Sequence, residues 1–247
     1  MPEAGVHYLD AAGPEGMRIY AIGDVHGRLD LLSRMHDAIA VELARDKPAD
    51  WRIIHLGDYV DRGPDSKGVL DFLIRRLEDD GRVLVLAGNH DIRFASFIES
   101  PAEWREFASF GGRETSRSYG VDIDFSSVEE IRRGHAALNQ AVPPAHAAFL
   151  KDLELSASFG DFFFCHAGIR PGIGLDFQEE TDLIWIRLEF HNHIALHPKV
   201  IVHGHTIVET AEILPNRVNI DTGAFISGRL TALIIDGTEK RLLEATV

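Results

Sequence analysis

The chain has 247 residues, of which 45% are hydrophobic and 26% are charged, a composition typical of a soluble globular protein with a sizeable core. Lys and Arg number 25 and Asp and Glu 39, so the formal net charge is −14, and such a surface repels nucleic-acid phosphates and anionic lipid. No apolar run approaches the ~20 residues of a membrane span, and a single cysteine, Cys165, fits a reducing compartment. We therefore expect a cytoplasmic protein without nucleic-acid or membrane partners, and make no prediction of its oligomeric state.

Short apolar runs alternate with helical patterns in the first third of the chain. Residues 18–22, 51–56 and 82–87 are apolar runs that lead into glycine-containing turns, as buried strands do. Between them, apolar side chains recur at helical spacing over 29–43 and 69–77. This alternation predicts a mainly parallel sheet with right-handed crossovers.

Helical patterns dominate the middle of the chain, from about residue 92 to residue 152. We predict that this segment is a mainly helical excursion within a single domain spanning 1–247. Its aromatic side chains fit two roles equally well, a wall over a functional cleft or the core of the segment itself. They include Trp104, Phe107, Phe110 and Tyr119.

Strand patterns return after the helical segment. The run 156–165 predicts a hairpin that turns at Gly160 and Asp161. The other predicted strands lie at 199–203, 218–221, 229–236 and 240–245. Together these patterns predict the fold class α/β, with two packed mixed β-sheets flanked by helices.

Side chains that can bind metal follow five of the predicted strands. The carboxyl ends of strands in an open α/β sheet border one crevice, so groups far apart in sequence can converge there. Carboxylate, amide oxygen and imidazole together suit divalent ions such as Mn, Fe or Zn, and the turns contain no cysteine, which argues against a structural zinc site. The five segments are GDVHG (23–27), GDYVDRG (57–63), GNHD (88–91), HAG (166–168) and GHT (204–206).

In this order, the five segments resemble the motifs of the calcineurin-like metallophosphoesterases, and GDYVDRG is similar to that of the phosphoprotein phosphatase branch, including its bacterial and phage serine/threonine phosphatases. The likeness extends over about 18–236, where IWIR (184–187) and NIDTGA (219–224) also resemble bacterial members. The resemblance implies a β-sandwich flanked by helices, with a site for two divalent metal ions at one edge. We expect manganese first, with iron or zinc as alternatives.

The resemblance also implies two sets of metal ligands that share the carboxylate of Asp58. The first set is Asp24, His26 and Asp58, and the second is Asp58, Asn89, His166 and His205. Two ions roughly 3.5–4 Å apart can share a water, lower its pKa and neutralise the oxygens of a phosphate. The resemblance therefore predicts hydrolysis by direct attack of metal-bound water, without a phospho-enzyme.

The remaining motif residues are assigned by the resemblance to the phosphate and its leaving group. His90 would be the general acid, oriented by Asp61, because a basic alkoxide leaving group needs a proton. Arg62 and Arg187 would bind phosphate oxygens through their planar paired donors. Asn89 is a further predicted substrate contact.

Several substrate classes remain open at this stage. The motif GDYVDRG favours a serine/threonine protein phosphatase that acts on phosphoproteins or phosphopeptides. The alternative is a dinucleoside polyphosphate hydrolase acting on a molecule such as diadenosine tetraphosphate, because GNHD and HAG are much like the turns of that related bacterial family. Paired arginines and the acidic surface disfavour a cyclic-nucleotide or nucleic-acid diesterase, and the complete set of candidate residues disfavours a scaffold without turnover.

Other candidate side chains have structural explanations. Cys165 precedes His166 on a strand, so it should face the opposite way and lie in the core, and His55 is expected to be structural. His203 fits either the site or a buried, hydrogen-bonded position. Three further histidines are expected on an exposed loop: His191, His193 and His197.

Overall fold

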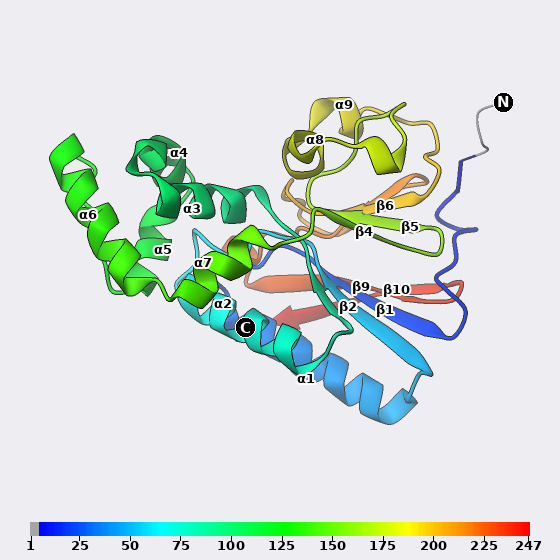
Figure 1. Ribbon diagram of the computed structural model, residues 1–247. Coiled ribbons are helices and arrows are strands. Elements are labelled where there is room, and N and C mark those ends of the chain that lie inside the picture. Colours follow the sequence, from blue (N-terminus) through cyan, green and yellow to red (C-terminus); the bar gives the residue numbers. More distant parts are fainter. Residues whose placement is uncertain (1–4) are drawn as a thin grey trace.

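Two five-stranded sheets pack face to face in the computed structural model, which describes residues 5–247 (Figure 1). The first sheet contains β1 (Met17–Ile22), β2 (Asp50–His55), β3 (Val83–Val85), β9 (Arg229–Asp236) and β10 (Glu239–Thr246), in the order β10-β9-β1-β2-β3. The second contains β4 (Ser156–Phe159), β5 (Phe162–Cys165), β6 (Val200–His203), β7 (Glu212–Ile213) and β8 (Arg217–Asn219), in the order β4-β5-β6-β8-β7. In the first sheet β1, β2 and β3 are parallel, and β9 and β10 add antiparallel pairs at one edge. In the second sheet β5, β6 and β8 are parallel, and β4 and β7 pair antiparallel at the two edges. The predicted fold class, two packed mixed sheets, is confirmed.

Helices cover the outer faces of both sheets (Figure 1). The first sheet carries α1 (Leu29–Asp46) and α2 (Ser66–Asp79), and the second carries α8 (Glu180–Trp185) and α9 (Leu188–His191). In β1, Tyr20 packs on the helix side and Ile19 packs between the sheets; in β5, Phe164 packs between the sheets and Phe163 toward α8. This alternation is what strands buried on both faces produce.

The helical segment that follows β3 lies at one end of the two sheets (Figure 1). It contains α3 (Asn89–Glu99), α4 (Trp104–Ser109), α5 (Gly112–Ser118), α6 (Val128–Ala141) and α7 (Pro144–Lys151), with a short 3-10 turn at Pro101–Glu103; later in the chain lie a second such turn at Leu175–Phe177 and α10 (Ala224–Ser227). Phe107 and Tyr119 are buried and Trp104 packs against the same core, whereas the ring of Phe110 meets that of His90 with centroids 5.7 Å apart. The aromatic side chains therefore divide between the two predicted roles.

The histidines outside the motifs are placed more deeply than expected. The prediction that His197 lies on an exposed loop is wrong, because its ring is buried and stacks on Phe190, with centroids 5.8 Å apart. His193 and His191 are partly exposed. His203 is buried edge-on against the same phenylalanine, so it belongs to the packing under α9.

Strand boundaries also differ from the sequence pattern. β3 is shorter than the predicted 82–87 because Leu86 leaves the ladder and forms an isolated bridge to Glu154. The two-residue strand β7 was not predicted. None of the helices among the described residues is long and apolar enough to cross a membrane.

Candidate metal centre

Five strand ends bring the motif side chains to one edge of the two sheets. Strands β1, β2 and β3 of the first sheet lead into the motifs that begin at residues 23, 57 and 88, and β5 and β6 of the second sheet lead into those at 166 and 204. Because these strands run parallel within each sheet, their carboxyl ends lie together. All six predicted ligands are buried: Asp24, His26, Asp58, Asn89, His166 and His205.

The turns of the site have an unusual backbone. Five site residues adopt positive φ: His26 (44°), Asp58 (55°), Asp61 (69°), Arg62 (65°) and His205 (65°). Lys47 is the one other non-glycine residue of the described range with positive φ. Such conformations cost about 1–3 kcal/mol each and persist only where the surrounding structure enforces them. The fold therefore holds these side chains in the site at a cost in stability.

Asp58 belongs to two groups of potential ligand atoms that lie within 4.8 Å of one another: His26, Asp58 and His90, and Asp58, His166 and His205. One of its oxygens is 3.4 Å from Nε2 of His26 and the other is 3.4 Å from Nε2 of His166. Nε2 of His166 is also 3.0 Å from Oδ1 of Asn89 and 3.2 Å from Nδ1 of His205. Ligands about 2.1 Å from a shared ion stand about 3.0–3.4 Å apart at octahedral or tetrahedral angles, so this spacing fits bound metal.

A hydrogen bond to the turn after β6 fixes the position of Asp24 beside the cluster. The carboxylate of Asp24 accepts a hydrogen bond from the backbone N–H of His205, at 3.3 and 3.1 Å for its two oxygens. The group of His26 and Asp58 also contains His90, whose Nε2 is 3.9 Å from Asp58. The structure thus brings Asp24 to the border of the cluster.

Charges within the cluster shift the pKa values of its members strongly. Burial raises the pKa of Asp58, but three histidines outweigh it and hold that pKa well below the usual range; the histidines are His166, His90 and His26. Burial lowers the pKa of His166, but Asp58 and Asp24 outweigh it and raise that pKa to about 9. The carboxylates therefore draw positive charge into a buried site, which is the electrostatic condition for holding cations.

His90 and Asp61 form a hydrogen-bonded pair beside the cluster. Nδ1 of His90 is 2.7 Å from Oδ2 of Asp61, whose other oxygen accepts a hydrogen bond from the Thr115 hydroxyl at 2.6 Å. Burial lowers the pKa of His90, but Asp58 and Asp61 outweigh it, so the pKa is raised. The pair therefore favours the protonated form of the imidazole, whose Nε2 faces the cluster.

The two arginines border the cluster at different places. Nη2 of Arg62 is 3.2 Å from Nε2 of His90, and Nε of Arg187 donates to Nε2 of His205 at 3.0 Å. Each guanidinium retains further N–H donors beyond these contacts. An anion lying over the ligand cluster would therefore contact a guanidinium cation on each of two sides.

Sequence reasoning missed the roles of two buried aspartates. Asp91 accepts hydrogen bonds from the backbone N–H groups of Asp58, Tyr59 and Gly88, at 2.7, 2.9 and 2.9 Å, and so ties two turns of the site together. Asp221, which follows β8, adds a second buried carboxylate beside Asp24: burial first and then Asp221 raise the pKa of Asp24. Both residues lie in segments noted above, GNHD and NIDTGA, but nothing in their spacing indicated these contacts.

A third missed residue lies on the outer side of the site. The guanidinium of Arg93 lies over the rings of both Phe110 and Trp185, at 3.8 and 3.9 Å from their centroids. Trp185 in turn lies edge-on to His205, with centroids 5.8 Å apart. Arg93 thereby joins the helical segment to α8 beside the cluster.

Most of the chain is similar in sequence to known proteins. Residues 17–213 match the family model described as calcineurin-like phosphoesterase. The asymmetrical bis(5′-nucleosyl)-tetraphosphatase PrpE of Anoxybacillus flavithermus is 28% identical over 230 residues, covering 86% of this chain and 88% of that protein. The protein of the same name from Bacillus thuringiensis is 25% identical over 242 residues, covering 88% and 90%.

Two solved structures share the fold. One, described as "a putative diadenosine tetraphosphatase", has a TM-score of 0.62 at 20% identity and covers 92% of this chain and 93% of that one. A protein serine/threonine phosphatase of Saccharomyces cerevisiae, similar to human phosphatase PP5, has a TM-score of 0.53 at 14% identity and covers 95% and 81%. At these identities the likeness shows the fold alone.

Proposed function

The chain belongs to the calcineurin-like phosphoesterase family, and on that premise we propose that it hydrolyses dinucleoside tetraphosphates at a centre that holds two divalent metal ions. The observation that carries this proposal is the shared name of two sequence relatives that match most of the chain, both asymmetrical bis(5′-nucleosyl)-tetraphosphatases. This order of candidates reverses the one that the motif GDYVDRG favoured. Both candidate functions require the same metal chemistry.

The donor set of the site fits two such ions, with manganese as the first candidate and iron or zinc as alternatives. His166, His205 and Asn89 would hold one ion, His26 and Asp24 the other, and the shared Asp58 both. When bound, the ions would activate water and neutralise phosphate oxygens.

The other polar side chains act on the substrate itself. Arg62 and Arg187, which border the cluster at His90 and His205, would bind and orient the phosphate oxygens. Asp61 fixes the ring of His90 through Nδ1, which leaves Nε2 to give a proton to the departing oxygen.

The pair of His90 and Asp61 favours a second candidate, a phosphoserine or phosphothreonine phosphatase. A nucleotide leaving group is weakly basic and departs without a proton, whereas the alkoxide of serine or threonine is strongly basic and needs one. The raised pKa of His90 keeps such a proton available. A phosphoprotein or phosphopeptide is therefore the substrate of this second candidate.

A side-by-side assay separates the two candidates. The manganese-loaded protein is given diadenosine tetraphosphate and phosphoserine or phosphothreonine peptides, and kcat/KM is compared because that ratio reports discrimination between substrates. Preference for the dinucleotide, with AMP and ATP as unequal products, supports the proposal. Preference for the peptides overturns it in favour of the second candidate.

A further inference from the structure

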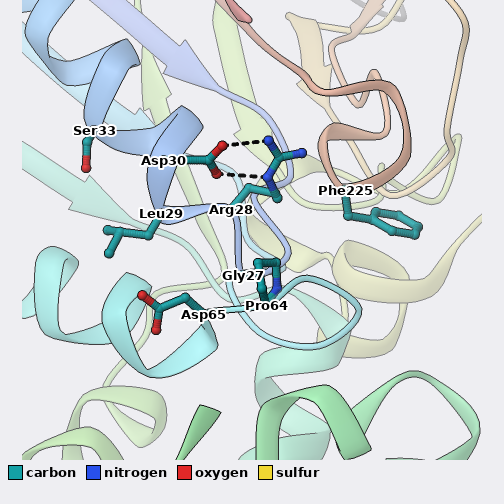
Figure 2. A pocket seen from close by; sticks show the side chains of 8 residues that line it. All are labelled: Gly27, Arg28, Leu29, Asp30, Ser33, Pro64, Asp65 and Phe225. Carbon is teal, nitrogen blue, oxygen red and sulfur yellow. Dashed lines mark hydrogen bonds and ion pairs between the residues drawn. The ribbon is translucent and has the colours of Figure 1, made fainter. Parts of the chain in front are cut away.

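A groove of about 740 Å³ opens beside the metal centre, and its volume falls within the roughly 300–1,000 Å³ of small-molecule sites. Its walls come from the start of α1, the turn before α2, and α10 (Figure 2). The residues that carry the argument are Gly27, Arg28, Asp30, Ser33, Asp65 and Phe225. In Figure 2, Ser33 and Phe225 lie toward opposite ends of the groove, with Arg28 and Asp30 between them.

Phe225 connects this groove to the metal centre. Its ring lies edge-on to His26, with centroids 5.3 Å apart, and the guanidinium of Arg62 lies over it at 4.9 Å. Gly27, in the wall of the groove, directly follows His26 in sequence. A molecule whose phosphate is held at Arg62 and the ligand cluster therefore has the groups that follow that phosphate beside Phe225.

The polar groups of the groove suit a neutral molecule that carries hydrogen-bond donors. Arg28 donates to both carboxylate oxygens of Asp30, at 2.8 and 2.6 Å, and to the carbonyl of Ala224 at 2.8 Å, so its charge is already paired (Figure 2). Asp65 adds a second carboxylate, which leaves one net negative charge on the lining (one Arg against two Asp). Further phosphate groups are repelled from such a surface.

We propose that this groove binds the nucleoside that is attached directly to the phosphate at Arg62, with the base against Phe225 and the ribose hydroxyls toward Asp30 and Ser33. Aromatic rings give a base a stacking surface, and carboxylate and hydroxyl oxygens accept hydrogen bonds from ribose hydroxyls. This inference rests on the proposed function. Water attacks the phosphorus held there, the P–O–P bond to the next phosphate breaks, and a nucleoside monophosphate leaves from the groove while a nucleoside triphosphate leaves from the other side.

Two variants test the groove from its two ends. Ser33→Trp fills it at a position away from the ligand cluster, and Phe225→Leu removes the aromatic surface while keeping an apolar side chain. Val41→Trp is the matched control, because Val41 lies on the same helix, is exposed and does not line the groove. For each protein, kcat/KM is measured for diadenosine tetraphosphate and for glycerol 2-phosphate, which has no base.

We divide kcat/KM for diadenosine tetraphosphate by kcat/KM for glycerol 2-phosphate. We expect this ratio to fall at least tenfold in Ser33→Trp and in Phe225→Leu, and to stay within twofold of the wild type in the control. An unchanged ratio in Ser33→Trp, with the wild type active on the dinucleotide, overturns the groove assignment alone. A wild type that hydrolyses phosphopeptides but not the dinucleotide overturns the proposed function as well. Circular dichroism checks that each variant is folded; if Ser33→Trp is not, Phe225→Leu decides the question by the same criterion.

Discussion

Gly88 is the residue at which two turns of the site come into contact. A Cβ atom there would lie 2.1 Å from the backbone nitrogen of Asp58 and 2.2 Å from its Oδ1, so the shared ligand would have to move. We expect Gly88→Ala to lower the free energy of unfolding by about 1–3 kcal/mol and to reduce bound metal, measured by urea unfolding and by elemental analysis. Gly81→Ala is the control, because a Cβ at Gly81 has no neighbour within 4 Å; equal losses in both variants would contradict the steric argument.

His90 gives the second prediction at this scale. In His90→Asn we expect kcat for an aliphatic phosphate monoester to fall by about 10²–10⁴, the usual contribution of a general acid, and kcat for p-nitrophenyl phosphate to fall much less, because its leaving group is weakly basic. Metal content should stay the same. Loss of metal together with equal losses on both substrates would instead place His90 among the ligands, as its distance to Asp58 would allow.

The sequence predicted which residues form this site better than it predicted how they are held. Asp58, His166 and His205 could be named because metal-binding side chains followed five strands in a known order. The positive φ of Asp58 and the contacts of Asp91 could not, because a backbone conformation and a tertiary hydrogen bond leave no trace in residue spacing. Such features are decided by which turns the fold brings together.

At the scale of elements, long apolar strands were predicted well and short ones poorly. The run at 18–22 forms β1 because it is buried on both faces and pairs on both sides. β3 and β7 have three and two residues, too few to establish a period. Their ends are set by partners distant in sequence, such as the bridge from Leu86 to Glu154.

The contact between α1 and β2 contains two buried histidines, and it predicts a dependence of stability on pH. Nε2 of His36 is 3.2 Å from Nε2 of His55, and their rings are stacked. Burial first and then Arg76 lower the pKa of His36 to about 4, and burial lowers that of His55 well below its usual value. Both rings are therefore neutral in the folded protein at pH 5, whereas the unfolded chain binds protons there.

The sign follows from proton linkage. Because the pKa values of the two histidines are lowered in the folded protein, the pair does not reduce the free energy of unfolding above pH 6.5. That free energy falls as the pH drops from about 6.5 toward 4. At pH 5 the loss is about 2 kcal/mol for His36 alone. Between pH 7 and pH 5, we expect the free energy of unfolding to fall by at least about 2 kcal/mol more in the wild type than in the double variant His36→Leu/His55→Leu. Urea unfolding at both pH values measures this difference. Parallel losses in the two proteins would show that other groups cause the dependence.

At the scale of the whole molecule, the candidate ligands come from both halves of the sandwich. Asp58 follows β2 of the first sheet, whereas His166 and His205 follow β5 and β6 of the second. The layer shared by the two sheets is lined with apolar side chains, such as Ile19 and Phe164. A metal held by both sets of ligands would therefore link the sheets at their carboxyl edge.

Removal of metal should accordingly destabilise the fold as a whole. Ions that bind the folded state alone add about 2.7 kcal/mol when their free concentration is 100 times Kd, so we expect a chelator to lower the melting temperature of the wild type and excess manganese to restore it. In Asp58→Asn, which changes the ligand shared by both groups, the difference between the two conditions should largely disappear. His193→Ala is the control, because His193 belongs to neither group and should keep the full difference. A wild type that loses activity with chelator but melts at the same temperature would show that the ions do not join the two sheets.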